Sequence, residues 1–369
     1  MRSLHQISNH EDMTTALRIV QEEHEAKKVL TENLDKFTKE LKSAFEVIDL
    51  GPDLQKQKSF NMITASDGSS LRFETTTGHL EKIAIAAVCV GGHTNTDYLE
   101  TIELLKATVV KPNEHPKDIA KLTMQDMEYC VTVQFAERDV IGNCVHLLDG
   151  GIASLLWSIV KMNHFDYSFA LNSDPYLMET LVFLAKEGLL VGSPKKISNV
   201  ESGIISLFKA DIPNVDLLSE KYILSKLLQN NELIVASTNG RNIVNQVSTS
   251  GFGRKTNDGY TSDSKLANLV NEYKSLFIND YRSVFLKIGG NPFPIKLEFL
   301  NPSMLNNFNF LKGIEIEMNG ITPIPFPQNR ADKLAKSGRK LAKKKFLMKS
   351  NYGKNSYELL LNKPVPFRN

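Results

Sequence analysis

The sequence predicts a mixed α/β protein in which helices flank a mixed β-sheet, and three observations lead to this class. Short apolar runs that suit buried strands alternate with longer segments of helical spacing. The run from Ile83 to Val90 is apolar throughout, as expected for a strand that is buried on both faces. Helical patterns also stand at both ends of the chain, which predicts a long N-terminal helical arm and a basic C-terminal helix.

The N-terminal arm is predicted as one helix over residues 11–48, which contain neither proline nor glycine and precede Gly51-Pro52. Its apolar residues recur at alternating spacings of four and three, which is a heptad-like seam: Leu30, Leu34, Phe37, Leu41, Ala44 and Ile48. Such a seam suits an amphipathic helix that packs on its own domain, and it equally suits a dimerisation arm.

Between the two ends, the pattern predicts the elements in order. Strands are expected within residues 58–110 (at 60–65 and 83–90) and at 145–148, 189–191, 284–288 and 295–299. Helices are expected at 117–138, 152–160 and 174–187, and a loop at 248–263. We therefore divide the chain into the arm (1–55), a main domain (56–330) and the basic helix with its tail (331–369).

Composition limits the classes of function. Hydrophobic residues make up 41% of the 369 residues and charged residues 23%, as in ordinary globular proteins. The net charge is only +2, so an affinity for nucleic acid needs local clustering of basic residues. The three cysteines form no CxxC pair, which predicts a reducing compartment without disulfides or a zinc site. With no signal-peptide pattern and no long apolar span, we expect a cytoplasmic protein without a membrane partner.

Two Asp-Gly steps, Asp67-Gly68 and Asp149-Gly150, each follow an apolar run that reads as a buried strand. Asp-Gly is an ordinary turn signal, and a turn is one interpretation of each step. A carboxylate at a strand end beside glycine also suits the close approach of a ligand. If the two strands are neighbours, Asp67 and Asp149 can hold a divalent cation.

Metal-dependent phosphodiester cleavage uses clustered carboxylates of this kind. Two divalent cations about 4 Å apart activate a water molecule and stabilise the leaving oxygen. Manganese and magnesium prefer oxygen ligands, which Asp and Glu supply from several elements. A glutamate on the intervening helix would complete the set, and Glu128 and Glu137 both lie on the predicted helix 117–138.

Five short motifs follow one another in a characteristic order within residues 58–345. They are residues 63–69 around Asp67, the glutamate-bearing helix, Leu147–Gly150, Val191–Lys195, and Pro323–Pro327 leading into Ala331–Ala335. In this order they resemble the NurA family of DNA-repair nucleases. The resemblance implies an RNase H-like core, a Mn²⁺- (or Mg²⁺-) dependent 5′–3′ exonuclease and/or endonuclease acting on DNA ends, a homodimer, and partnership with a HerA-type hexameric ATPase.

The resemblance assigns roles residue by residue. Asp67 and Asp149 match the two family aspartates. Glu128 is favoured over Glu137, because a glutamate only 12 residues before Asp149 leaves little room for the helix to end and the chain to cross the sheet. Lys195, or its neighbour Lys196, is expected to pair with the phosphate, with an exposed turn lysine as the alternative.

The C-terminal motif departs from the family pattern, in which a tyrosine and a histidine lie eight residues apart. Ile324 and Asp332 stand at these positions here. Asp332 can still ligate manganese or magnesium, or it can simply be a carboxylate at the N-terminus of a helix. Ile324 cannot replace a phenol, so the strength of catalysis is in doubt.

The C-terminal helix carries nine basic residues and no acid between Lys333 and Lys354. Leu334, Leu341 and Met348 recur every seven residues and predict a packed stripe. The remaining face is either a solvated surface or a track for phosphates. For the track we name Lys336, Arg339, Lys340, Lys343 and Lys344 as DNA-binding residues.

These features favour a metal-dependent DNA nuclease that works at DNA ends, with Asp67, Glu128 and Asp149 as metal ligands and Asp332 and Lys195 as further catalytic residues. A non-catalytic DNA-end-binding or adaptor protein on the same fold is the alternative. A metal phosphoesterase for small substrates explains the carboxylates but leaves the basic helix without a role.

Overall fold

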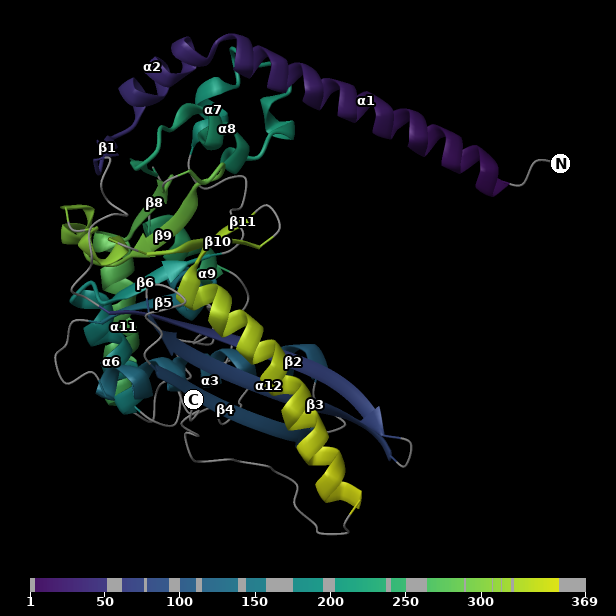
Figure 1. Ribbon diagram of the computed structural model, residues 1–369, viewed down its shortest axis with the longest axis vertical. Coiled ribbons are helices and arrows are strands. Elements are labelled where there is room, and N and C mark those ends of the chain that lie inside the picture. Colours follow the sequence, from purple (N-terminus) through teal and green to yellow (C-terminus); the bar gives the residue numbers. More distant parts are fainter. Residues whose placement is uncertain are drawn as a thin grey trace. The chain divides into compact units, whose positions relative to one another are not determined.

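The computed structural model describes residues 4–51, 62–75, 78–92, 100–110, 115–138, 144–156, 175–194, 203–236, 240–249, 264–288, 290–306, 308–312, 314–319 and 322–351 (Figure 1). The chain forms two compact units. The smaller unit contains residues 1–52, 196–238 and 283–296, and the larger unit contains the rest. Among the described residues, no helix combines the length and apolar character that crossing a membrane requires.

The larger unit is built on a mixed sheet with the strand order β9-β6-β5-β2-β3-β4. The strands are β2 (Ile63–Thr75), β3 (Gly78–Gly91), β4 (Glu100–Val109), β5 (Val145–Asp149), β6 (Leu190–Ser193) and β9 (Ile295–Phe299). The pairs β2–β3 and β3–β4 are antiparallel, whereas β5 is parallel to β2 and β6 is parallel to β5. The mixed α/β class with its RNase H-like sheet is therefore confirmed.

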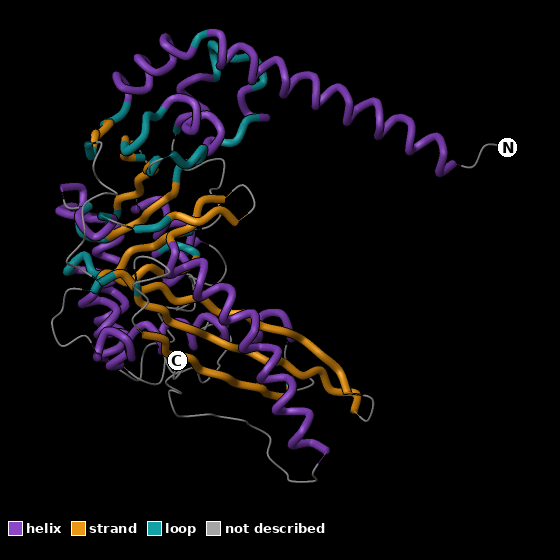
Figure 2. Tube along the Cα trace, viewed as in Figure 1, coloured by secondary structure: helices purple, strands orange, loops and turns teal. Residues whose placement is uncertain are grey.

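Helices cover both faces of this sheet (Figure 2). The helix α3 (Pro116–Arg138) packs Met127, Val131 and Phe135 against one face of β3. The helix α12 (Phe326–Asn351) lies on the other face, where Ala331 and Ala335 contact Val88 and Val90 of β3. Because successive side chains of a strand point to opposite faces, alternate residues of β2 and β3 face α3 and α12.

A second core of the larger unit lies around the aromatic residues Tyr273, Phe277 and Tyr281. It is formed with α6 (Pro175–Lys186), α9 (Gly240–Thr249) and α11 (Ser264–Asp280). Two 3-10 helices, η2 (Pro302–Asn306) and η3 (Asn309–Leu311), and the hairpin of β10 (Ile316–Asn319) and β11 (Thr322–Pro325) precede α12. The predicted loop 248–263 lies almost wholly outside the described residues.

The smaller unit places helices over three short strands in the order β1-β7-β8. Its elements are α1 (Leu4–Glu32), α2 (Leu34–Ala44), β1 (Val47–Asp49), α7 (Ile204–Phe208), η1 (Val215–Leu217), α8 (Glu220–Leu227), β7 (Glu232–Val235) and β8 (Arg282–Leu286). Its core contains Leu30, Phe37 and Leu41 of the predicted seam.

The arm differs from the single predicted helix in two respects. The helix is broken at Asn33, whose backbone is not helical, and Ile48 lies in β1 rather than on the helical seam. Of the predicted seam, Leu30, Phe37 and Leu41 are buried, whereas Leu34 is half-buried and Ala44 is exposed. Met13 and Leu17, nearer the start of α1, are also exposed.

The packed stripe of α12 also differs from the prediction. Leu341 and Met348 are exposed, and the residues that face the sheet are mostly small: Ala331, Ala335, Gly338, Ala342 and Phe346. A Cβ at Gly338 would collide with Ala86 of β3, so glycine lets the helix lie close to the sheet. Small side chains rather than the leucine repeat therefore select the buried face.

The position of Phe37 in the smaller unit gives a stability test. Phe37 is fully buried and meets the ring of Phe208 edge to face at 5.2 Å. We expect Phe37→Ala to lower the free energy of unfolding by about 3–5 kcal/mol, because it removes a large core side chain and leaves a cavity. The matched control is Leu17→Ala, at an exposed position of α1, which should change the free energy of unfolding by less than about 0.5 kcal/mol. Urea unfolding followed by circular dichroism measures both, and equal losses would contradict this packing.

Candidate active site

The two aspartates lie side by side at the centre of the larger unit's sheet. The strands β2 and β5 pair in parallel from Ile63–Val145 to Ser66–Leu148, so that the next residues are Asp67 and Asp149. Ser66 faces α3, where its hydroxyl accepts a hydrogen bond from Thr132 at 2.8 Å. By strand alternation, Asp67 therefore faces α12, as does Asp149, which contacts Gln328 of that helix.

The backbone next to Asp149 turns sharply away from the sheet. Gly150 and Gly151 have φ angles of 100° and 87°, a region that side-chain-bearing residues rarely adopt. The strand β2, in contrast, continues to Thr75, beyond its last pair with β5. The edge of β2 after Asp67 is therefore no longer covered by β5, and this step in the sheet forms the candidate site.

The first Asp-Gly step is not a turn, because β2 runs straight through Asp67 and Gly68. Instead, the missing side chain of Gly68 leaves room for side chains of α3 to approach β2 closely. A Cβ at position 68 would overlap the carboxylate of Glu128 and the side chain of Met124, both from α3. The expectation that this step ends a strand was therefore wrong. The sequence analysis expected a ligand beside this glycine, and the groups that lie there are side chains of α3.

Of the two candidate glutamates, Glu128 is the one that the structure places against β2. It is 6% exposed and its carboxylate reaches the backbone of Gly68. Glu137 lies in the last turn of α3 and is exposed. Glu128 approaches from the α3 face, however, while Asp67 and Asp149 project from the α12 face.

This division between faces bears on metal binding. The donor atoms of Asp67, Asp149 and Glu128 are carboxylate oxygens, the donors that manganese and magnesium prefer. Within the described ranges, no three acidic, histidine or cysteine side chains are grouped closely enough to hold a metal ion. The donor set therefore suits a hard cation in its chemistry, and the two aspartates are the pair that one face of the sheet brings together.

Gln328 on the first turn of α12 is a site residue that the sequence analysis missed. Its Nε2 donates to Asp149 Oδ1 at 3.2 Å and to the carbonyl oxygen of Ser193 at 2.6 Å. Its Oε1 accepts a hydrogen bond from the Ser193 hydroxyl at 2.9 Å. The predicted helix began only at residue 331, so Gln328 was assigned to the preceding segment although it lies four residues before Asp332.

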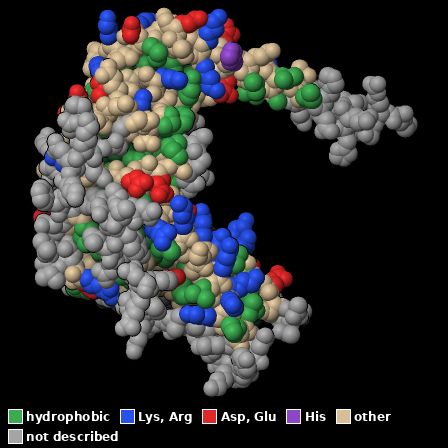
Figure 3. Space-filling view, viewed as in Figure 1, with side chains coloured by type: hydrophobic (Ala, Val, Ile, Leu, Met, Phe, Trp, Pro, Cys, Tyr) green, Lys and Arg blue, Asp and Glu red, His purple; other side chains and the backbone are tan. Residues whose placement is uncertain are grey.

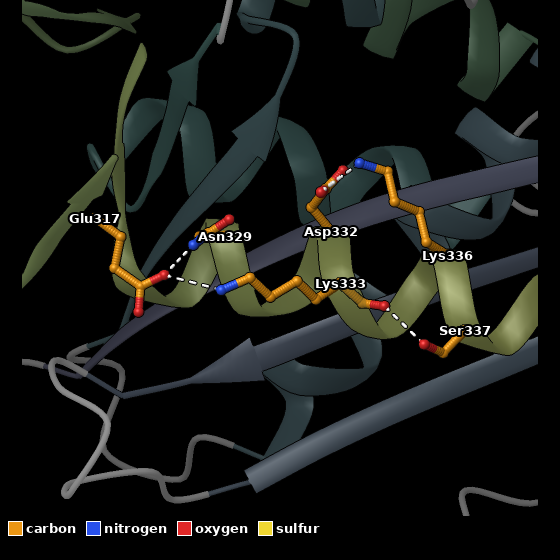
Figure 4. Close-up of polar contacts among 6 residues, drawn as sticks. All are labelled: Glu317, Asn329, Asp332, Lys333, Lys336 and Ser337. Carbon is orange, nitrogen blue, oxygen red and sulfur yellow. Dashed lines mark hydrogen bonds and ion pairs between the residues drawn. The ribbon is translucent and has the colours of Figure 1, made fainter. Parts of the chain in front are cut away.

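Asp332 and Ile324 stand where the resemblance placed the last two site residues. Asp332 forms an ion pair with Lys336 of the same helix at 2.6 Å, and the Asp332 side chain is 13% exposed (Figure 4). Ile324 is buried in β11 opposite Glu317. Glu317 in turn accepts bonds from Asn329 and Lys333, which join the hairpin to the start of α12 (Figure 4).

A second buried carboxylate, Glu298 of β9, supports the turn after Asp149 and was also missed. Its carboxylate lies against Gly151, where a Cβ would collide with it, and it accepts a long hydrogen bond from the amide of Ala153 at 3.4 Å. Nearby, the Tyr273 hydroxyl donates to the carbonyl oxygen of Ile152. Burial, with smaller contributions from Tyr129 and Glu298, raises the pKa of Tyr273 well above its ordinary value.

Several lysines of α12 lie near acidic side chains, some of them from other elements of the fold. Besides the pairs of Lys333 and Lys336, Lys345 lies near Glu103 of β4, whose pKa is raised by burial and lowered in part by that lysine. The other predicted DNA-binding residues differ in surroundings: Arg339 donates to the carbonyl oxygen of Ser70 at 2.8 Å, Lys343 lies 5.2 Å above the ring of Phe73, and Lys340 and Lys344 are exposed. Figure 3 shows the Lys and Arg side chains gathered along α12. Lys195 and Lys196 lie outside the described residues.

The chain matches no protein-family model and no curated protein sequence. Solved structures of NurA nucleases resemble it over most of its length. The NurA nuclease from Sulfolobus solfataricus aligns with 92% of this chain and 98% of its own, at 14% identity and a TM-score of 0.47. A NurA structure with manganese aligns with 91% of this chain and 99% of its own, at 12% identity and a TM-score of 0.44. A NurA structure bound to dAMP and manganese aligns with 89% of this chain and 93% of its own, at 13% identity and a TM-score of 0.40. Likeness at this level assigns no activity, so function is argued below from the site.

The contact between Gly68 and Glu128 gives a test of the site's packing. We expect Gly68→Ala to cost about 1–3 kcal/mol of unfolding free energy, because its Cβ displaces the Glu128 carboxylate and presses on Met124. In a double-mutant cycle with Glu128→Ala, the two changes should couple by at least about 0.5 kcal/mol. Glu74→Ala, at an exposed position of β2, is the control. Strict additivity of Gly68→Ala and Glu128→Ala would show that the two positions do not touch.

Proposed function

We propose that this protein is a metal-dependent nuclease that hydrolyses phosphodiester bonds of DNA at the step between β2 and β5. The observation that carries the proposal is the register of these strands, which sets Asp67 and Asp149 side by side where β5 ends and β2 continues. Mn²⁺ or Mg²⁺ would be held by Asp67 and Asp149, and Glu128, which lies against Gly68 on the α3 face, is proposed as a third ligand. When bound, the metal supplies activation of water and stabilisation of charge at the phosphate.

The chain's own residues provide the rest of the reaction. The two aspartates fix the cation on one face of the sheet, and the buried surroundings of Asp67 strengthen electrostatic interactions there. Water is the nucleophile, so no covalent intermediate with the protein forms. Lys195, two residues after Ser193 of β6, is proposed to pair with the phosphate as a point charge, and Asp332 to serve as a further carboxylate.

The surface of α12 supports a nucleic acid as substrate. This helix begins beside Asp149 at Gln328 and continues along β2 as far as Phe73, where Lys343 lies over the ring. Exposed Lys340 and Lys344 add positive charge along the same helix. A phosphate backbone bound along α12 would therefore lead to the aspartates, whereas a small phosphoester would not need this track.

The first prediction of this proposal concerns the aspartates. Asp67→Asn and Asp149→Asn should each lower Mn²⁺-dependent cleavage of linear DNA by about a thousandfold, the rate equivalent of about 4 kcal/mol, because a neutral amide is a poor cation ligand. Cleavage is measured on single- and double-stranded DNA with Mn²⁺, Mg²⁺ or a chelator. Asp216→Asn, at an exposed aspartate of η1, is the control. Full cleavage by the double variant of Asp67 and Asp149 would reject the proposal.

The second prediction concerns α12. Lys340→Gln with Lys344→Gln should weaken metal-free DNA binding and flatten the dependence of log K on log[salt] by up to about 2 for a duplex, because two phosphate contacts are lost. The charge-matched control is Lys36→Gln with Lys186→Gln, which removes two exposed lysines that are paired with Asp211 and Glu272. Fluorescence anisotropy at several salt concentrations measures the slope. An equal change in both double variants would show that only net charge matters.

The alternative function is a DNA-end-binding or adaptor protein with a weakened site. It is favoured by the buried Ile324 at the position of the family's phenol and by the absence of a three-ligand cluster among the described residues. The two functions differ in one measurement. An adaptor binds DNA through α12 yet shows no Mn²⁺ affinity that depends on Asp67.

We also propose that the protein works as a homodimer at DNA ends with a HerA-type hexameric ATPase, as the resemblance implies. Support from this chain is limited to α1, where Met13, Leu17 and Val20 form an exposed apolar strip. Light scattering of the purified chain, alone and with such an ATPase, tests both associations. A monomer that does not bind the ATPase would leave the nuclease without these partners.

A further inference from the structure

The side-chain amide of Gln328 has only one orientation that satisfies its neighbours. The Ser193 carbonyl oxygen can only accept, and it lies 2.6 Å from the amide, so Nε2 must be on that side. The second hydrogen of Nε2 then points to Asp149 Oδ1, and the Ser193 hydroxyl donates to Oε1. Every polar atom of this amide, which is 1% exposed, is thereby used.

The backbone fixes both ends of this arrangement. Asp149 and Ser193 are directly opposite in the parallel pair β5–β6, so one side chain from α12 can contact both strands at their last residues. Gln328 itself lies in the first turn of α12, whose Ala331 and Ala335 are packed on β3. The amide therefore ties the Asp149 carboxylate of β5 to both β6 and α12.

The chemical character of the residue matters as much as its position. A glutamate here would place a second negative charge beside Asp149, and a lysine would neutralise the carboxylate that a cation needs. A neutral donor instead orients Asp149 and leaves its charge available. Hydrogen-bonding partners of this kind set the direction and basicity of metal-ligating carboxylates.

We propose that Gln328 is a positioning residue that holds the Asp149 carboxylate in the direction required for binding Mn²⁺. This inference rests on the proposed nuclease function and adds a residue to it that the resemblance does not supply. Gln328 does not contact the substrate or the cation. It acts through Asp149, and Ser193 acts through Gln328.

The test is a titration with Mn²⁺ alone, without DNA, followed by the electron paramagnetic resonance of the free ion. Gln328→Met keeps an unbranched side chain of similar size but removes the donor, and it should weaken Mn²⁺ binding by about 10- to 100-fold. Asn329→Leu is the matched control, because Asn329 is an equally buried amide on the same turn that contacts Glu317 instead of Asp149. Its Mn²⁺ affinity should equal that of the wild type.

A second readout separates orientation from loss of structure. Raising the Mn²⁺ concentration should restore cleavage by Gln328→Met, with a shifted midpoint, because the ligands themselves are present. If that variant does not fold, Ser193→Ala, which removes the bond that fixes Oε1, should weaken Mn²⁺ binding by about threefold or more.

Each result decides a different point. A wild-type protein without Mn²⁺ affinity overturns the proposed nuclease and this inference with it. A wild type that binds Mn²⁺ while Gln328→Met binds it equally well, or while Asn329→Leu loses as much affinity, overturns the role of Gln328 alone. If only Ser193→Ala folds, an unchanged Mn²⁺ affinity of that variant also overturns the role of Gln328.

Discussion

The parallel pairing of β2 with β5 is the constraint on which the rest of the larger unit depends. Its register sets Asp67 beside Asp149, and its early end exposes the edge of β2 from that point onward. A shift of one residue would turn Asp67 toward α3 and remove the pair, because strand residues alternate between faces. Burial of Ile63, Ala65 and Leu147, which share the face of Asp67, opposes such a shift.

Two helices complete the site from opposite sides, and each uses a different kind of contact. From the α3 side, Glu128 approaches the backbone of Gly68, which is possible only because that residue lacks a side chain. On the other face, α12 lies close to β3 through alanines and glycine, and this brings Gln328 to Asp149. The same closeness places basic side chains of α12 along β2, where Arg339 bonds to Ser70 and Lys343 lies over Phe73.

The comparison between sequence and structure is clearest at the two Asp-Gly steps. Local chemistry predicted the close approach of a ligand at both steps and assigned both to strand ends. Only Asp149-Gly150 ends a strand, while Gly68 lies within one. Local preference cannot tell these cases apart, because pairing of β2 with β3 supplies the hydrogen bonds that keep Asp67 and Gly68 extended. The leucine repeat of α12 predicted the wrong packed stripe for a similar reason, because the helix face with small side chains packs on the sheet.

The sequence by itself determined the class of fold, the buried strands, the carboxylate chemistry and the concentration of positive charge near the C-terminus. These follow from hydrophobic period and residue type, which act locally. Tertiary structure decided which carboxylates share a face, which lysines of α12 are matched by Glu317 and Glu103, and that an amide at position 328 reaches Asp149. Those outcomes depend on strand register and on the distance between helix and sheet, and both are set by packing among segments far apart in the chain.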